Sequence, residues 1–211
     1  MLRRQHRMVR PIGDLISDVF YDKRLISVRD DTLDGFELAL PKPVTWFDTS
    51  TLASHEEEPM GTSFFNAAEA RVVLAFLKRL AFVARLRDRS RTFSVLVLAG
   101  YLGQVGRLQD MVASNADAFE GLSIEPNTVD AAQGREADFV VFSVTRSNRH
   151  GSTGFLRERK RINVALSRAR LGLAVVGDRD FCVSQEGVLR KILSHIDDHP
   201  DGCVVKAADD E

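Results

Sequence analysis

Apolar residues recur every three or four positions in several stretches of the chain, which is the spacing of a helix with one buried face. The first of these stretches covers residues 11–20. Asn66 begins a longer one, and Glu69 follows three residues later, as in a capping box that closes the amino end of a helix. Three more helices are predicted over residues 104–114, 157–168 and 188–196.

Short, continuous apolar runs separate these helical stretches. Such runs, when turn residues bound them, are typical of strands that are buried on both faces. They occupy residues 44–48, 94–99, 139–144 and 172–178. Because strands and helices alternate, the chain predicts an α/β fold with a mostly parallel sheet between two layers of helices. Ligands of such sheets bind at the carboxyl ends of the strands, so we expect the functional motifs there.

The composition agrees with one globular domain. The chain has 211 residues, of which 44% are hydrophobic and 28% are charged. We expect a domain over residues 1–199 and a mobile acidic tail over residues 200–211. No apolar run is long enough to span a membrane and no signal peptide opens the chain, so we expect no membrane partner. Cys182 and Cys203 lack the spacing of a metal site and indicate reduced thiols in a cytoplasmic protein.

Charge is distributed unevenly, although the formal net charge is only −1. Between Arg146 and Arg170, eight Lys and Arg residues stand against a single acidic residue, Glu158. Acidic residues gather instead at the carboxyl terminus. A basic block of this kind favours an anionic partner such as nucleic acid.

Four blocks of sequence carry the candidate chemistry. They are LRRQHRMVRPIGDLISDVFYDKRL from residue 2, VLVLAGYLGQVGRLQ from residue 95, TVDAAQGREADFVVFSVTRSN from residue 128 and RERKRINVALSRAR from residue 157. The first resembles motif IV of the superfamily 1B helicases, the third is similar to their motif V and the fourth to their motif VI. The second resembles the family segment in which a strand runs into T-P-Y-x-x-Q. Four blocks in the same order and spacing are far more specific than any one of them.

The family is the group of ATP-dependent DNA and RNA helicases related to the nonsense-mediated-decay helicase, and the part matched is its second RecA-like motor domain. The resemblance implies a RecA-like P-loop NTPase fold with three αβα layers. It implies ATP with Mg²⁺ as the cofactor. It also implies two partners, single-stranded nucleic acid and a first RecA-like domain supplied in cis or in trans.

One part of a complete ATPase does not occur in this sequence. There is no G-x-x-x-x-G-K-[ST] phosphate loop, and the glycine-rich stretch 100–106 lacks the Lys and Ser or Thr that hold phosphate and Mg²⁺. In the family, that loop and the Mg²⁺-binding acids belong to the first domain. We therefore expect a fragment or one half of a split motor, which alone does not hydrolyse ATP.

Two arginines are the candidate catalytic residues. Phosphoryl transfer depends on charge placed against the transferring group, and the planar, permanently charged guanidinium suits that task. The resemblance implies that Arg7 and Arg168 supply this charge across the interface between domains. On the predicted helix 157–168, Arg168 flanks the apolar stripe while Arg170 points the other way. The other interpretation is a solvated basic helix.

Five more residues are candidates for nucleotide contacts. In the family, the motif V glutamate, here Glu136, meets the ribose hydroxyls; otherwise it caps a surface turn. Gln133 and Gly134 shape the turn before it, since glycine permits a close approach. Gln5 is implied to lie near the nucleotide or the domain interface. His6 occupies a position where the family stacks the adenine, but an ordinary packing or surface role remains equally open.

Contacts with nucleic acid are assigned to polar residues near strand ends. The Thr128 hydroxyl could bond a backbone phosphate. Ala99 and Gly100 replace the Thr and Pro of the family segment, so the hydroxyl contact of that Thr is in doubt. An ordinary loop role is open for each candidate, and the run from His55 to Glu58 reads as a solvated loop, so no metal site is predicted. The candidates are Thr128, Tyr101, Gln104, Arg146 and Asn148.

Two classes of function remain open at this point. In the first, the chain is the carboxyl-terminal motor half of an ATP-dependent superfamily 1 helicase or translocase, and closure of the cleft between its domains moves the strand. In the second, it is a non-catalytic module of RecA-like fold that binds nucleic acid or a protein. Arg7, Glu136 and Arg168 favour the first, because a pure binding module does not need them.

Overall fold

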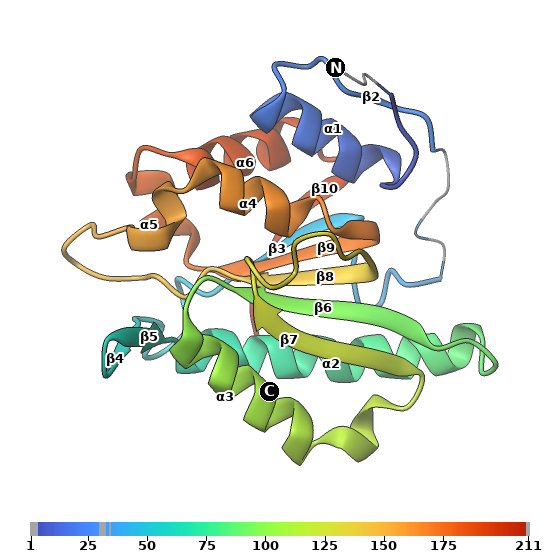
Figure 1. Ribbon diagram of the computed structural model, residues 1–211, viewed down its shortest axis with the longest axis horizontal. Helices are drawn as coiled ribbons and strands as arrows, with labels where there is room; N and C mark the ends of the chain where they lie inside the picture. The colour runs from blue at the N-terminus through green and yellow to red at the C-terminus, as the bar shows by residue number, and fades with distance from the viewer. Residues whose placement is uncertain (1–3, 30–32, 34, 210–211) are drawn as a thin grey trace.

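The computed structural model describes residues 4–29, 33 and 35–209. Its centre is a sheet in which the described residues form six parallel strands in the order β10-β3-β9-β8-β6-β7 (Figure 1). Their bounds are Val44–Asp48 (β3), Phe93–Ala99 (β6), Leu122–Thr128 (β7), Ala137–Ser143 (β8), Ala169–Gly177 (β9) and Cys203–Ala207 (β10).

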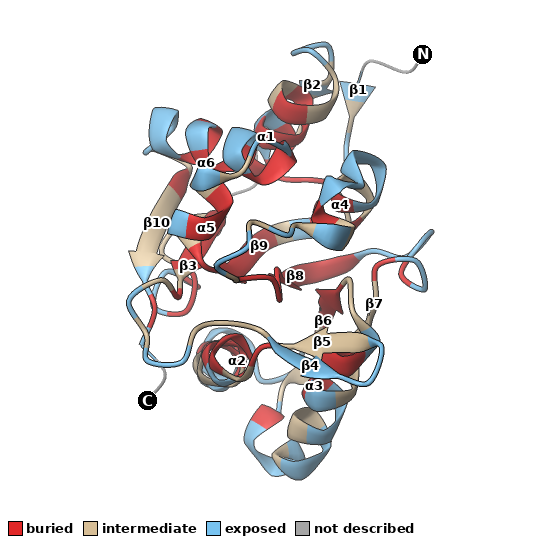
Figure 2. Cartoon of the chain, turned by 90° about the vertical axis from the view of Figure 1, so that its left-hand side faces the viewer, coloured by how far each residue is buried: buried red, intermediate tan, exposed pale blue. Residues whose placement is uncertain are grey.

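Helices cover both faces of this sheet (Figure 1, Figure 2). One layer holds α1 (Arg10–Phe20), α4 (Arg159–Leu166), α5 (Arg179–Ser184) and α6 (Val188–Asp198). The other layer holds α2 (Ala67–Arg87) and α3 (Leu102–Ser114). Outside the sheet, β1 (Arg4–Gln5) pairs with β2 (Ile26–Ser27), and β4 (Glu58–Met60) forms a hairpin with β5 (Ser63–Phe65). Two short 3-10 turns, η1 and η2, cover Ala116–Phe119 and Gly154–Arg157.

Two apolar layers hold the fold together, one on each side of the sheet. Successive side chains of a strand point to opposite faces. In β8, Val140 and Phe142 therefore pack under α1, α4 and α6, while Phe139 and Val141 pack against α2. All four side chains are fully buried, as the continuous apolar run predicts. The three-layer αβα architecture with a parallel sheet, predicted from the sequence as a RecA-like fold, is confirmed.

The long helix α2 begins where the sequence predicts, but only half of its capping box forms. Asn66 Oδ1 accepts a hydrogen bond from Glu69 N at 2.9 Å, so the amino-terminal cap is present. The Glu69 carboxylate does not return to the backbone of Asn66, whose N–H donates instead to Gln104 Oε1 at 2.8 Å. Glu69 is therefore free for other contacts inside the protein.

The last part of the chain differs from the predicted mobile tail. Cys203–Ala207 form β10, which pairs in parallel register with β3 at the edge of the central sheet. Ala208 N then donates to Asp48 O at 2.8 Å. Backbone pairing with β3 and burial of Cys203 order this segment, whose sequence CVVKA is mostly apolar. Asp210 and Glu211 lie outside the described residues.

None of the described helices combines the length and the apolar character needed to cross a bilayer.

Candidate functional site

The predicted site residues divide between two opposite edges of the sheet. Because the six strands are parallel, their amino ends share one edge and their carboxyl ends share the other. Glu136 directly precedes β8 and Arg168 directly precedes β9, so both lie at the amino edge. Thr128 ends β7 and Arg146 follows β8, so both lie at the carboxyl edge. The expectation that all motifs gather at the carboxyl ends was therefore correct only for the predicted nucleic-acid residues.

The segment 129–136 connects these two edges. It starts at the carboxyl end of β7 and returns to the amino end of β8, a strand of seven residues that spans roughly 20 Å. Val129 and Ala132 anchor it in the apolar layer under α1 and α4. Gly134 has a φ of 82°, in the left-handed region that favours glycine, and no atom lies within 4 Å of the position of a Cβ. The motif can thus contribute to both edges, with Thr128 at one and Glu136 at the other.

Arg7 and Arg168 come together at the amino edge, although 160 positions separate Arg7 from Ser167. Arg7 Nη1 donates to the carbonyl oxygen of Ser167 at 3.2 Å, and Arg168 Nη2 donates to the Ser167 hydroxyl at 3.1 Å. Two backbone carbonyls hold the rest of the Arg168 guanidinium, at 2.9 Å for Val164 and 3.1 Å for Arg135. The Arg168 side chain is therefore fixed in place by the turn that follows α4.

One carboxylate accompanies these two guanidinium groups. Arg7 Nε donates to Glu136 Oε2 at 2.7 Å, and Arg170 Nη1 lies 3.8 Å from Glu136 Oε1. We call Arg7, Glu136, Arg168 and Arg170 the amino-edge cluster. Partial burial lowers the pKa of Arg168, and the positive charge of Arg7 lowers it further, while Glu136 acts in the opposite direction. Three positive charges against one negative charge leave an excess that an anion would relieve.

The structure changes the reason why Arg168 is well placed. The sequence predicts a helix that continues to residue 168, with Arg168 beside its apolar stripe. Helix α4 ends at Leu166, and Ser167 and Arg168 form the turn before β9. Arg170 is an exposed residue of β9 beside Glu136, not a residue on the far side of a helix. The turn places both side chains near Glu136, which the helical pattern did not predict.

Gln5 organises the segment that carries Arg7. Its Oε1 accepts hydrogen bonds from Arg7 N at 3.0 Å and Met8 N at 2.8 Å, and its Nε2 donates to Met8 O at 3.0 Å. A Cβ on Gly13 would lie 2.5 Å from Gln5 Nε2 and 2.1 Å from Ser27 Oγ, so a larger residue here would displace the side chains of Gln5 and Ser27. Sequence reasoning missed Gly13; a glycine inside a strongly helical stretch was the available signal.

The remaining nucleotide candidates face solvent. His6 is exposed beside the segment that Gln5 organises, and Gln133 is exposed in the turn before Gly134. Gln133 N donates to Asp130 O at 3.2 Å. Their side chains have the solvent access that a ligand contact requires, and their assignment to the nucleotide remains a prediction.

At the carboxyl edge, Arg146 is buried inside the fold. Only 5% of the residue is exposed. Its Nη2 lies 2.8 Å from Glu57 Oε1, its Nη1 donates to the Tyr101 hydroxyl at 3.0 Å, and its guanidinium carbon lies 4.4 Å from the centre of the Phe64 ring. Glu57, which the sequence places in a solvated loop, is therefore half of a buried ion pair. A direct contact between Arg146 and nucleic acid would need this arrangement to open.

The other candidates for contact with nucleic acid differ in how much of each residue is exposed to solvent. Gln104 is fully buried, and its amide bonds Asn66 and the Ser143 hydroxyl, so it has no exposed surface in this structure. Asn148 and Thr128 are half-buried. Asn148 Nδ2 donates to Glu57 at 3.1 Å, while the Thr128 hydroxyl accepts from Ala131 N at 3.2 Å. The structure therefore places Thr128 and Asn148 nearer to solvent than Gln104.

The buried carboxylate of Glu69 lies behind this edge. The sequence predicted only a helix-capping role for it. Glu69 Oε2 accepts from the Ser143 hydroxyl at 2.5 Å and from Thr145 N at 2.8 Å, while Oε1 is buried without a partner among the described residues. Burial, with a smaller effect from the charges of Asp178 and Glu57, raises the pKa of Glu69 to about 8 despite these two hydrogen bonds.

Glu69 also holds a strained backbone. Thr145 has a φ of 71°, which is unusual for a β-branched residue. Its N–H donates to Glu69, and its carbonyl accepts from Asn66 Nδ2 at 3.4 Å. Strain of this kind persists where surrounding contacts fix it, and it occurs often at functional sites. Here it lies immediately before Arg146, where the chain leaves β8.

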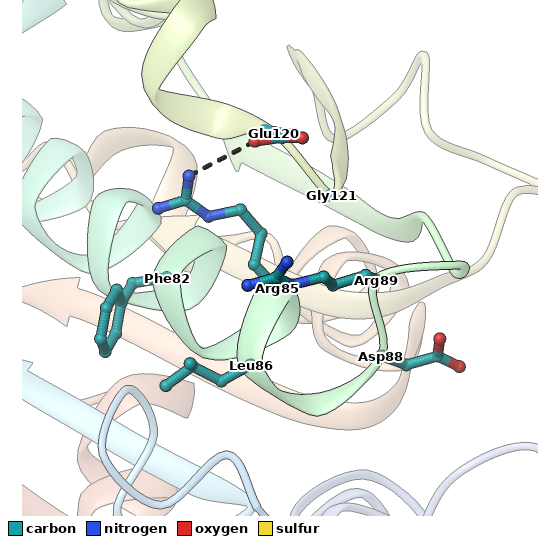
Figure 3. Close-up of a pocket in the computed structure, with 7 residues that line it drawn as sticks. All are labelled: Phe82, Arg85, Leu86, Asp88, Arg89, Glu120 and Gly121. Atoms are coloured by element: carbon teal, nitrogen blue, oxygen red, sulfur yellow. Dashed lines mark hydrogen bonds and ion pairs between the residues drawn. The ribbon is translucent and has the colours of Figure 1, made fainter.

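A separate groove contains none of the site residues predicted at the amino edge or at the carboxyl edge (Figure 3). It measures about 330 Å³ and runs between the end of α2 and the start of β7. Arg85 crosses it to reach Glu120 at 3.4 Å. It contains no residue predicted for ATP or nucleic acid, so its exposed Arg89 is a suitable control position for variants.

Comparison with known proteins gives the family. The AAA domain family matches residues 1–180. The chain is 30% identical to the regulator of nonsense transcripts 1 homolog of Arabidopsis thaliana, over 97% of this chain and 16% of that protein. It is 32% identical to the regulator of nonsense transcripts 1 of Caenorhabditis elegans, over 92% and 18% respectively. It is 28% identical to the ATP-dependent helicase NAM7 of Saccharomyces cerevisiae, over 96% and 21%.

These matches cover almost the whole chain but only a small part of each relative. The chain spans between 16% and 21% of the length of these three proteins. The family inferred from the motif blocks agrees with the matched family and with the helicase relatives. The chain therefore belongs to the AAA domain family, among the helicases related to regulator of nonsense transcripts 1.

Proposed function

We propose that the chain is the second motor half of an ATP-dependent superfamily 1 helicase or translocase. In this role it supplies charge to ATP that a first RecA-like domain binds, and it contacts single-stranded nucleic acid at its other edge. The observation that carries the proposal is the amino-edge cluster, in which Arg7 and Arg168 converge on Ser167 beside Glu136. Because the chain spans only part of its relatives, the activity of the whole motor belongs to the proposal.

The amino-edge cluster suits a polyphosphate. Arg7 and Glu136 have 40% and 45% of their side chains exposed, so a ligand can reach them. Three guanidinium groups surround one carboxylate, and the repulsion between Arg7 and Arg168 is part of what lowers the pKa of Arg168. Guanidinium groups bind phosphate oxygens through two parallel hydrogen bonds. ATP, bound with Mg²⁺ by the first domain, would supply the phosphoryl group whose transfer drives the motor.

Each member of the cluster has a distinct task in this proposal. Arg168, fixed by the carbonyls of Val164 and Arg135, holds its charge in one position and needs little rearrangement. Arg7 pairs with Glu136 when no nucleotide is bound and turns toward phosphate when the domains close. Glu136 is then free to accept a hydrogen bond from a ribose hydroxyl. Gln5 keeps Arg7 in reach by fixing the turn from residue 5 to residue 8.

The opposite edge would hold the nucleic acid. Thr128 and Asn148 are the half-buried polar candidates there, and Tyr101 joins them through its hydroxyl, which accepts from Arg146 and from Phe155 N at 3.0 Å. Arg149 adds an exposed basic side chain next to Asn148. Binding at one edge and hydrolysis at the other would be coupled through the segment 129–136, which touches both.

A non-catalytic binding module of the same fold is the second candidate. It would use the carboxyl edge without the amino-edge cluster. Holding partly desolvated arginines close together costs free energy, because their charges repel, unless an anion binds between them. The cluster therefore favours the motor over a binding module. Cys182 and Cys203 are free, buried thiols, which fits the cytoplasmic location that we propose for either candidate.

Reconstitution tests the proposed motor. The purified chain alone should show no ATPase activity stimulated by nucleic acid, because it contains no phosphate loop. Addition or fusion of a first RecA-like domain encoded in the same gene or beside it should produce that activity. The measurement is the steady-state rate of phosphate release with and without single-stranded nucleic acid. Turnover by the chain alone that persists through repurification, or a reconstituted pair without turnover, contradicts the proposal.

Salt dependence tests the carboxyl edge separately. The isolated chain should bind single-stranded nucleic acid weakly, and the affinity should fall as salt rises, because each contacted phosphate releases counterions. Sequence preference should be slight, because phosphate contacts carry no sequence information. Arg149→Ala should reduce the salt slope by about 1, while Arg89→Ala, in the groove of Figure 3, should leave it unchanged. Fluorescence anisotropy gives the salt slope of each variant. An affinity that does not change with salt would contradict phosphate binding at the carboxyl edge.

A further inference from the structure

A cluster of metal-ligating side chains lies between α1 and α6, and it contains none of the predicted site residues. Asp18 belongs to α1, His195 belongs to α6, and His199 follows the end of α6. Each residue offers one ligand atom, and these three atoms all lie within 4.8 Å of one another. Because 177 positions separate Asp18 from His195, only the packing of the two helices brings the set together.

Hydrogen bonds already orient both imidazole rings. His195 Nδ1 lies 2.9 Å from Asp18 Oδ2, and its Nε2 is buried without a partner among the described residues. His199 Nδ1 lies 2.8 Å from the carbonyl oxygen of His195, which can only accept a hydrogen bond. His199 therefore carries its proton on Nδ1 and presents the lone pair of Nε2. A backbone carbonyl that orients a histidine in this way is the usual support of a metal-binding ring.

We propose that Asp18, His195 and His199 bind one divalent transition-metal ion, with Zn²⁺ as the best candidate. Two imidazole nitrogens and a carboxylate oxygen are a donor set that suits Zn²⁺ and its neighbours, and that suits Mg²⁺ and Ca²⁺ poorly. Two ligands on a tetrahedral Zn²⁺ ion are roughly 3.3 Å apart, which follows from bonds of about 2.0–2.1 Å. Asp18 and His195 are close to that separation already.

His199 makes the remaining adjustment. Its ring stacks on that of His195 with 3.9 Å between centroids and 15° between planes. Parallel rings do not aim two lone pairs at one point, so the His199 ring must rotate toward Asp18. This movement is inexpensive, because His199 is exposed and lies beyond the last turn of α6. The site is thus partly preformed on the helices and completed by rotation of the His199 side chain.

Lys23 is a charged neighbour of Asp18 at this site. Lys23 Nζ lies 3.3 Å from Asp18 Oδ1 and leaves Oδ2 for the ion. Lys23 is 81% exposed in its side chain, so it can withdraw when a divalent cation arrives.

Calorimetry on the full 211-residue chain tests this site without any ATPase assay. The tag-free chain, stripped with a chelator, is titrated with ZnCl₂ at pH 7.5 and at pH 5.5. We expect one Zn²⁺ per chain at pH 7.5, weaker binding at pH 5.5 because protons compete, and a higher Tm with Zn²⁺ present. The outcome does not depend on the proposed motor function, since no nucleotide or second domain takes part.

Variants assign the binding to these residues. His199→Gln, at an exposed position that should not disturb folding, should weaken Zn²⁺ binding by at least about tenfold, and so should Asp18→Asn. His6→Gln, an exposed histidine at the other candidate site, should leave Zn²⁺ binding unchanged. Absence of saturable binding overturns the proposal. Binding that survives His199→Gln also overturns it, because the ion then lies elsewhere and the cluster is only an ion pair between α1 and α6.

Discussion

Replacing Arg168 with alanine in a motor that contains both RecA-like domains should lower kcat by about 10³-fold or more. Charge builds on the phosphoryl group as it transfers, so a guanidinium aimed there acts on the transition state more than on bound ATP. Nucleotide affinity should therefore change much less than kcat. The hydrogen bonds from Arg168 to Val164 and Arg135 hold the side chain ready before ATP arrives. Steady-state ATPase rates and nucleotide binding, measured on the same variants, separate the two effects.

Two matched variants make this result specific to Arg168. Arg168→Lys should restore little activity, because an ammonium group lacks the planar fork that bonds two oxygens. Arg89→Ala removes an equally basic residue from the groove of Figure 3 and should keep most of the activity. Arg170 is unsuitable as the neutral control, since it lies 3.8 Å from Glu136 inside the cluster. Near-normal turnover of Arg168→Ala would show that the catalytic arginine has been assigned wrongly.

The stability of the isolated chain should fall as pH rises from 6.5 to 8, by up to about 1.4 kcal/mol per pH unit. Glu69 is the cause. In the folded protein its pKa is about 8, whereas the ordinary value is 4.5. Between these values the folded state keeps a proton that the unfolded state has lost, so each rise in pH favours unfolding. Above pH 8 and below pH 4.5 the two states hold the same number of protons at this group, and the contribution is constant.

The chosen pH range isolates Glu69 from the other buried groups. The pKa of His195 is lowered from its ordinary value of 6.5, so its effect is confined to more acidic solution. Burial raises the pKa of Cys182 well above 9.0, so its effect appears only in alkaline solution. Glu69→Gln keeps the shape but cannot ionise, and it should remove the slope. Urea unfolding at several pH values measures the slope of the free energy of unfolding against pH. Glu58→Gln, on the exposed strand β4, is the control and should leave the slope unchanged. A slope that persists in Glu69→Gln would refute the assignment.

Several elements of the fold could be read from the sequence because their pattern is local. The apolar runs of β6 and β8 are buried on both faces, and they need no knowledge of their neighbours to be recognised. The edge strand β7, with sequence LSIEPNT, escaped prediction because it is only half-buried and contains Pro126 among polar residues. Its strand conformation comes from pairing with β6. The same holds for β10, whose pairing with β3 orders a segment that looked like a tail.

The candidate site shows a similar division. The motif blocks named Arg7, Glu136 and Arg168, and the structure brings these three residues together. The sequence could not show that Arg168 leaves α4 before β9, because the helical spacing continues past Leu166. It could not show that Arg146 is buried against Glu57 either, since three consecutive glutamates read as a solvated run. Both outcomes depend on contacts between distant segments.

The sequence by itself determined the α/β class, the buried central strands, the cap of α2 and the helicase family, because residue identity and short-range periodicity carry that information. Only the tertiary structure decided which edge of the sheet each motif occupies. A parallel sheet requires the chain to cross back between strands, so residues a few positions apart, such as Thr128 and Glu136, end at opposite edges. The same packing placed Glu69 away from water and set Asp18 against His195. Burial and proximity of this kind arise from strand order and helix packing, which no local pattern specifies.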